Sequence, residues 1–433
     1  MSEANEKSFA AHRARTDDDG GAPAKWKIIG PGLVVAATGV GAADMVATLV
    51  AGSRYGYGLL WAVILGVILK IILVEGAGRF TLATGRTIFE GWRSLGRWTT
   101  WYFGPYIMIW GFVYGATAMS SAALPLAAVF PVLPLWAWAI IMGLLGFVMV
   151  WFGKYSFFEK VTAALVGLMF VTVVGLAVIA APNIPEMLTG LVPVIPEGGV
   201  LYTLALAGGV GGTITLAAYG YWLREKGWYT PKWMRVMRID NSMAYVVTGV
   251  FVIAMLVVGA EVVRSAGVAL SSGDEGLLDL YAVLRAEYGD VVGTGFLIGF
   301  WAASFSSIIG VWNGVSLMFA DFWGNIRGKE SGHPDTRVGG KYFRFYVLWL
   351  TFPPMVLFAL GQPIGLILAY GVLGSLFMPF LALTLLGLLN GSRIPKEWAN
   401  KLHTNIALGI TALLFAVLGG QQLVKAVAPV FGG

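Results

Sequence analysis

The sequence predicts an all-α integral membrane protein with about eleven transmembrane helices, and three observations support this fold class. The chain of 433 residues is 58% hydrophobic and only 12% charged, whereas soluble domains carry about one-quarter charged residues. Apolar runs of about 20 residues recur after a polar start, and each is long enough to cross roughly 30 Å of hydrocarbon as a helix. Two of these runs are interrupted at their centres by glycines.

Each predicted helix corresponds to one apolar run bounded by polar, glycine or proline residues. In chain order the predicted spans are 28–52, 57–83, 100–129, 132–153, 157–181, 200–223, 241–264, 288–323, 341–360, 363–389 and 402–428. Residues 1–25 are polar, contain Asp17-Asp18-Asp19, and are too poor in apolar residues to order themselves. We therefore predict a disordered cytoplasmic tail over 1–25 and a single transmembrane domain over 26–433.

The distribution of basic residues predicts the orientation of the chain. If the tail is cytoplasmic, every second connection is cytoplasmic too, and those connections carry most of the lysines and arginines: Arg86, Arg93, Arg97, Lys154, Lys160, Arg224, Lys226, Lys232, Arg235, Arg238, Arg327, Lys329, Arg337, Lys341, Arg393, Lys396 and Lys401. This bias predicts an inner (plasma) membrane protein with its amino terminus inside and its carboxyl terminus outside. The net charge of +6 follows this topology, so it does not indicate a nucleic-acid partner.

The two interrupted runs predict a binding site in the middle of the membrane. The first break reads Thr-Gly-Val-Gly-Ala-Ala-Asp over 38–44, and the second reads Gly-Gly-Val-Gly-Gly-Thr over 208–213. Breaks at corresponding positions of two halves are typical of transporters, because unwound backbone exposes carbonyls, amides and helix ends at the bilayer midplane. We expect inverted repeats over about 28–181 and 200–389, with an extra helix over 402–428.

Polar residues near the breaks are candidates for substrate contact. Asp44 lies in the apolar layer, where a carboxylate costs several kcal/mol unless it faces a cavity or a partner. It can bind substrate, or it can accept hydrogen bonds from the amides that the broken helix frees. Thr213 and Thr215 offer hydroxyl oxygens to a substrate, although threonines commonly bond their own helix backbone.

The second predicted helix carries three ionisable residues that are candidates for coupling or charge balance. Glu75 and Arg79 are spaced i, i+4 and can form a structural ion pair on one helix face. Lys70 lies near the helix centre, from which its ammonium reaches neither membrane interface easily. We therefore expect Lys70 to have an internal partner such as Asp44, or to be neutral.

The sequence contains no constellation typical of an enzyme and predicts no cofactor. The three histidines, His12, His333 and His403, fall in the tail or in cytoplasmic loops, so no histidine metal cluster is expected in the membrane. There is no cysteine and no GxxxxGK[ST] motif, which argues against thiolate ligands and against an ATP-driven pump. The predicted activity is secondary or facilitated transport by alternating access.

From about residue 29 to 425 the chain resembles the Nramp divalent-metal transporters, which have the leucine-transporter-like fold. The resemblance is carried by Gly30-Pro31-Gly32, by the stretch AGSRYGYGLLW at 51–61, by Arg79 with Thr84-Gly85, by Ser306-Ser307 with Gly310, and by Pro379-Phe380. It implies a five-plus-five inverted repeat with helices one and six broken at mid-membrane.

The resemblance also shows where this chain departs from the family. The family's Asp-Pro-Gly-Asn falls on 41–44, so glycine replaces the aspartate and Asp44 replaces the asparagine; its Met-Pro-His falls on 215–217, Thr-Leu-Ala. The implied site consists of Asp44, Thr215 and backbone carbonyls near Gly41 and Gly212, which are ligands for Mg²⁺, Ca²⁺ or Mn²⁺. The acidic pair of proton-coupled members falls on Ala116 and Met119, so coupling by the usual route is not expected.

Two transport functions remain open at this point, beside a sensor or scaffold that has lost transport. The first is a transporter of a hard divalent cation, Mg²⁺ or Mn²⁺, that retains several waters and needs only one or two carboxylates. The second is a transporter of a small organic solute, such as an amine or an amino acid. In that case Tyr219, with Tyr221 and Trp222, would wall the pocket, and Asp44 would bind an ammonium.

Overall fold

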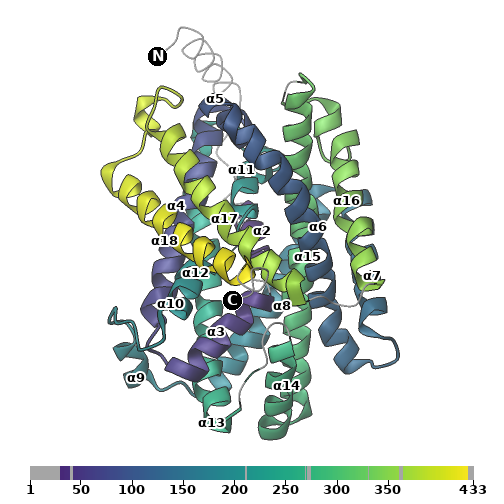
Figure 1. The fold of residues 1–433 in the computed structure, drawn as a ribbon, viewed down its shortest axis with the longest axis vertical. Helices are drawn as coiled ribbons and strands as arrows, with labels where there is room; N and C mark the ends of the chain where they lie inside the picture. The colour runs from purple at the N-terminus through teal and green to yellow at the C-terminus, as the bar shows by residue number, and fades with distance from the viewer. Residues whose placement is uncertain are drawn as a thin grey trace.

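In the computed structural model of the protein, the residues that the structure describes are 30–39, 42–209, 212–268, 270, 275–329, 331–359 and 364–427, and within them every regular element is a helix (Figure 1). The helices are α2 (Pro31–Ala37), α3 (Ala42–Tyr55), α4 (Leu60–Thr84), α5 (Ile88–Leu95), α6 (Arg97–Val129), α7 (Leu135–Phe152), α8 (Tyr155–Ile179), α9 (Ile184–Thr189), α10 (Val200–Gly209), α11 (Thr215–Glu225), η2 (Pro231–Trp233), α12 (Met234–Val258), η3 (Gly259–Val263), α13 (Arg264–Ala266), α14 (Glu275–Tyr288), α15 (Asp290–Ile326), η4 (Pro334–Thr336), α16 (Lys341–Ala359), α17 (Ile364–Leu389), η5 (Lys396–Trp398) and α18 (Leu402–Val427).

These helices confirm the predicted class of a multi-pass α-helical membrane protein. Among the described residues, seven helical segments are long and apolar enough to cross a membrane. These segments correspond to α4, α6, α7, α8, α12, α15 and α18. The other four predicted spans correspond to α2 with α3, to α10 with α11, to α16 and to α17. The predicted tail over 1–25 lies outside the described residues.

The first and sixth spans are each divided into two helices, as their glycines predict. The first divides between α2 and α3, and the sixth divides between α10 and α11. Gly212 has φ +92°, a left-handed backbone conformation that favours glycine. A Cβ atom on Gly212 would lie 3.1 Å from Cα of Gly39. The two breaks therefore lie against each other.

The long helix α15 forms the centre of the molecule. Every residue from 302 to 320 is buried, and α15 packs against α6, α7, α8, α11 and α16. Two of its glycines allow close approach: a Cβ on Gly310 would lie 2.0 Å from Thr38 Cγ2, and one on Gly314 would lie 2.3 Å from Trp222 Cζ2. Larger residues at these positions would push the broken helices away from α15.

The two ends of the bundle differ in charge. We define the basic face as the end formed by α5 and the connections 226–233, 327–340 and 390–401, at the top of Figure 1. The opposite end holds α9, α13 and α14 (Figure 1). The basic face is the one that the sequence predicts to be cytoplasmic.

Candidate functional site

The first break presents a backbone carbonyl that two other helices orient. The carbonyl of Thr38, just after α2, accepts a hydrogen bond of 3.2 Å from the Ser307 hydroxyl of α15. The Ser307 oxygen lies 2.7 Å from the Tyr114 hydroxyl of α6. Because the single Ser307 hydrogen points to Thr38, Tyr114 is the donor in the second contact. The first break is thus held by a chain of two neutral hydroxyl groups, of which Ser307 contacts the Thr38 carbonyl directly.

The second break presents the carbonyl of Gly212, and its partner is Lys70. The Lys70 side chain is fully buried, and its Nζ donates a hydrogen bond to the Gly212 carbonyl. The same Nζ lies 3.9 Å from Met378 Sδ on α17 and 5.4 Å from the centre of the Phe415 ring on α18. An internal partner for Lys70 was expected, and the Gly212 carbonyl is one.

The two threonines of the second break flank Gly212. Thr215 is the first residue of α11 and is buried, and a Cβ on Gly212 would lie 2.9 Å from its Oγ1. Thr213 is half-buried, and its Cγ2 would lie 3.5 Å from a Cβ on Gly374 of α17. Both threonines therefore lie beside the unwound backbone, where their hydroxyl oxygens are predicted to contact the substrate.

The predicted carboxylate is only partly described. Asp44 is the third residue of α3, so its backbone lies in the first turn of a helix that begins at the break. The Asp44 side chain and the whole of Gly41 lie outside the described residues. A carboxylate is stabilised in the first turn of a helix, because the free amides there carry partial positive charge.

The described groups around the two breaks offer neutral oxygen atoms as possible ligands for a cation. The carbonyls of Thr38 and Gly212 and the hydroxyl of Ser307 surround the breaks, and the first turn of α3 carries Asp44. Among the described residues, no group of three or more histidine, cysteine, aspartate or glutamate side chains could hold a metal ion. Any cation bound here would depend on carbonyl and hydroxyl oxygens, on Asp44 and on retained water.

Comparison with known proteins identifies the family. The model of the family described as Natural resistance-associated macrophage protein-like, Nramp, matches residues 32–425. The chain belongs to the Nramp family. The resemblance seen in the sequence is thereby confirmed across both breaks.

Relatives of this Nramp protein are distant in sequence. It is 27% identical over 320 residues to a divalent metal cation transporter of Chromohalobacter salexigens, covering 69% of this chain and 72% of that protein. It is 25% identical over 313 residues to a transporter of the same name from Staphylococcus aureus, covering 65% of this chain and 66% of that protein.

Solved structures support the fold. A manganese transporter of Eremococcus coleocola, crystallised with an aromatic bis-isothiourea compound, superposes with a TM-score of 0.80 at 16% identity, covering 96% of this chain and 90% of that one. Mhp1, a nucleobase-cation-symport-1 family transporter in a closed conformation, superposes with a TM-score of 0.59 at 15% identity, covering 92% and 91%. The predicted leucine-transporter-like architecture is thereby confirmed for this Nramp protein.

A buried carboxylate that the sequence analysis did not select holds the amino end of α2. Asp240 of α12 accepts hydrogen bonds from the backbone amides of Gly30 at 2.9 Å and Gly32 at 2.6 Å, and from the Tyr219 hydroxyl at 2.9 Å. We call these four residues the α2 latch. A Cβ on Gly30 would also lie 2.3 Å from Oε1 of Glu159, which pairs with Lys226.

Tyr219, which was predicted to wall a pocket for an organic solute, is one of the residues of the α2 latch. It lies one turn along α11 from Thr215, is fully buried, and uses its hydroxyl in the α2 latch. The polar atoms of the two other predicted wall residues are also engaged: Tyr221 donates to Asp321 at 2.7 Å, and Trp222 donates to Asn313 at 2.8 Å. These bonds join α11 to α15.

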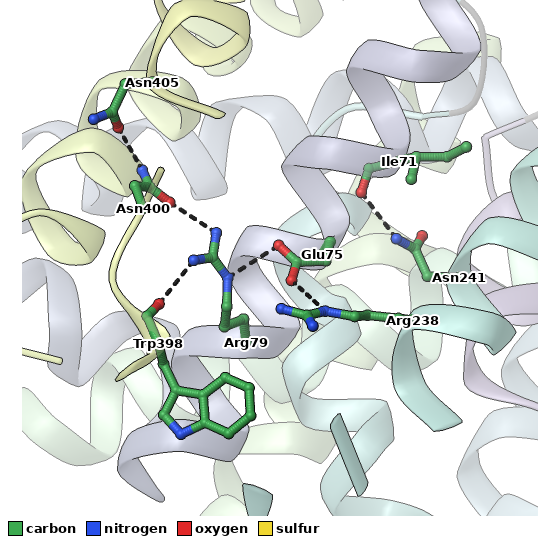
Figure 2. A network of polar contacts seen from close by, with 8 residues as sticks. All are labelled: Ile71, Glu75, Arg79, Arg238, Asn241, Trp398, Asn400 and Asn405. Carbon is green, nitrogen blue, oxygen red and sulfur yellow. Dashed lines mark hydrogen bonds and ion pairs between the residues drawn. The ribbon is translucent and has the colours of Figure 1, made fainter. Parts of the chain in front are cut away.

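Glu75 and Arg79 form a structural network near the basic face (Figure 2). Arg79 donates to Glu75 at 3.0 Å, to the Trp398 carbonyl at 2.8 Å and to Asn400 Oδ1 at 2.7 Å. Arg238 of α12 donates to the other Glu75 oxygen at 2.9 Å. The network joins α4, α12 and the connection before α18, and within the described part of the chain these bonds of Glu75 and Arg79 run to those three elements.

Proposed function

We propose that this Nramp protein moves a divalent metal cation across the membrane by alternating access, with the two helix breaks as its substrate site. The observation that carries the proposal is the contact between the breaks, where unwound backbone supplies cation-binding carbonyls in the middle of a transmembrane bundle. Its relatives in Chromohalobacter salexigens and Staphylococcus aureus are named divalent metal cation transporters.

The ligand set favours a hard cation. We assign Asp44, the Thr215 hydroxyl and the carbonyls of Gly41 and Gly212 as ligands, with water completing the shell. Mg²⁺ and Mn²⁺ both accept carboxylate, carbonyl and water oxygens. The thioether of Met378, 3.9 Å from Lys70 Nζ, adds a softer atom at the edge of the site and favours Mn²⁺ of the two, because Mg²⁺ takes oxygen ligands alone.

The membrane potential is a sufficient driving force. Two charges moved through 100 mV release roughly 2 × 2.3, or about 4.6, kcal/mol, and this favours inward movement if the basic face is cytoplasmic. We assign that orientation from the positive-inside bias, with the amino terminus inside. Ala116 and Met119, at the positions of the usual acidic pair, are buried apolar residues of α6, so we propose transport without proton coupling at those positions.

The alternative of an organic solute has less support. It depended on Tyr219, Tyr221 and Trp222 as pocket walls, and the polar atoms of all three are hydrogen-bonded to Asp240, Asp321 and Asn313.

The test is calorimetry and liposome uptake with the purified full chain. We expect Mn²⁺ to bind the wild type and Asp44→Ala to weaken binding by about 100-fold or more, because an anionic ligand in a low-dielectric site contributes several kcal/mol. The control is Asp290→Ala, which removes an exposed carboxylate outside the breaks. Absence of binding by Mn²⁺, Mg²⁺ and Ca²⁺ at millimolar concentration contradicts the proposal, and unchanged uptake by Asp44→Ala contradicts the assigned site.

A further inference from the structure

Lys70 places the amino group of its side chain in the proposed substrate site. It lies near the middle of α4, a 25-residue helix, and its side chain has no exposed surface. From this depth its ammonium cannot reach water by extending along the helix. The Nζ atom is held by the Gly212 carbonyl, the Met378 sulfur and the face of the Phe415 ring.

These three partners are the kinds of group that bind a cation. A carbonyl oxygen accepts from an ammonium or coordinates a metal, a thioether binds softer metals, and the face of an aromatic ring attracts positive charge. The Gly212 carbonyl is available because the φ of +92° directs the chain out of the helical hydrogen-bond pattern. Lys70 therefore bonds the same backbone oxygen that the proposed function assigns to the substrate.

We propose that the Lys70 side chain is a tethered occupant of the substrate site, which the divalent cation displaces from the Gly212 carbonyl when it binds. This inference rests on the proposed function. The two cations cannot share the oxygen, because an ammonium and a divalent ion a few ångströms apart repel one another strongly in a site shielded from water. Lys70 thus lowers the affinity for substrate, and its return to the carbonyl assists release.

Lys70 could instead have a structural role, in which it only fixes the second break to α4. This role predicts the opposite change in substrate affinity when Lys70 is removed. If the role is structural, replacing Lys70 leaves the Gly212 carbonyl less well oriented, and the substrate binds more weakly. If Lys70 competes with the substrate, replacing it leaves the carbonyl available, and the substrate binds more tightly. The sign of the change in affinity separates the two roles.

The experiment measures Mn²⁺ binding by calorimetry to the wild type, Lys70→Leu and Lys160→Leu in detergent, each verified as monodisperse. Leucine is neutral and adds no metal ligand. Lys160→Leu is the matched control, because it makes the same substitution at an exposed residue of α8. We expect Lys70→Leu to bind Mn²⁺ about tenfold more tightly or better, since one competing charged hydrogen bond is removed. Lys160→Leu should bind as the wild type does.

A third variant separates charge from packing. Lys70→Arg keeps a positive charge and N–H donors at the site, so it should bind Mn²⁺ no more tightly than the wild type. If Lys70→Leu does not remain folded, Lys70→Ala replaces it with the same expected gain. Equal or weaker binding by the neutral variant, or tighter binding by Lys70→Arg, overturns this inference while wild-type binding leaves the proposed function standing. Failure of the wild type and the neutral variant alike to bind Mn²⁺, Mg²⁺ or Ca²⁺ refutes the proposed function and this inference with it.

Discussion

Substitution of Asp240 by asparagine is expected to release α2 from the basic face. The carboxylate accepts hydrogen bonds from Gly30, Gly32 and Tyr219. Asparagine keeps one oxygen and replaces the other by an NH₂ group, which is a donor and cannot accept from a backbone amide. At least one buried amide of the α2 latch therefore loses its partner, while the volume of the side chain hardly changes.

The size of the effect follows from these contacts. A hydrogen bond to a charged group contributes about 1.5–3 kcal/mol, and leaving a buried amide unpaired costs about 1–3 kcal/mol. We therefore expect the position of α2 in which the latch is formed to lose about 2–4 kcal/mol relative to one in which the latch is broken. Each 1.4 kcal/mol changes an equilibrium constant about tenfold. The fraction of molecules with α2 displaced should therefore rise roughly 30- to 1,000-fold.

The absence of cysteine makes a direct assay possible. Leu33→Cys places a single thiol on α2 in a chain that otherwise has none. A membrane-impermeant thiol reagent, added to either side of proteoliposomes, then reports access to α2. We expect Asp240→Asn to accelerate labelling of Cys-containing protein from the side of the basic face. The control is Asp290→Asn, at an exposed residue paired with Arg285 near the opposite end.

Two results would contradict a role of the α2 latch in controlling access to the breaks. If Asp240→Asn lowers the thermal unfolding temperature but leaves the labelling rate of α2 unchanged from both sides, the carboxylate stabilises the fold without controlling access to the breaks. If labelling accelerates equally from both sides, α2 has lost its packing and has not opened in one direction.

Two further substitutions test the break and the network. Gly212→Ala should reduce Mn²⁺ affinity and uptake by about tenfold or more, because a side chain at φ +92° costs about 1–2 kcal/mol and its Cβ would meet Gly39; wild-type uptake would contradict the importance of this backbone. Arg79→Gln should destabilise the protein by about 1.5–3 kcal/mol, because it leaves the half-buried Glu75 carboxylate with one charged partner fewer. Thermal denaturation followed by tryptophan fluorescence measures this loss, and a change in Mn²⁺ affinity of the folded variant would show that the network reaches the site.

Most of the fold could be predicted from the sequence, because membrane helices are determined locally. A long apolar run has to satisfy its own backbone hydrogen bonds, so it forms a helix whatever its neighbours are. The breaks were visible for the same reason, since glycine strings interrupt two of the runs. The largest difference is at the seventh span, which begins at Met234 and not at 241. Its first turns carry Arg235, Arg238 and Asp240, which resemble a loop in sequence.

Only the candidate site residues that lie at a break could be predicted from the sequence. Gly212, Thr215 and Asp44 lie at or just after a break, as the glycine strings indicate, and their roles as ligands stay a prediction. Asp240 was missed because its amide partners are 208 and 210 residues away, and such pairs leave no local pattern. The contact between Met378 and Lys70 was missed for the same reason, since the two residues are 308 positions apart in the sequence.

The strengths of the contacts on α2 differ between its two ends, and this difference bears on the transport cycle. At the amino end the Asp240 carboxylate accepts hydrogen bonds from two backbone amides. At the carboxyl end the Thr38 carbonyl accepts one hydrogen bond of 3.2 Å from the neutral hydroxyl of Ser307. Neutral hydrogen bonds contribute about 0.5–1.5 kcal/mol and bonds to charged groups about 1.5–3 kcal/mol. The carboxyl end of α2 can therefore rearrange at the break when a cation binds, while Asp240 still holds the amino end in place. Binding and opening thus become separate steps, as alternating access requires.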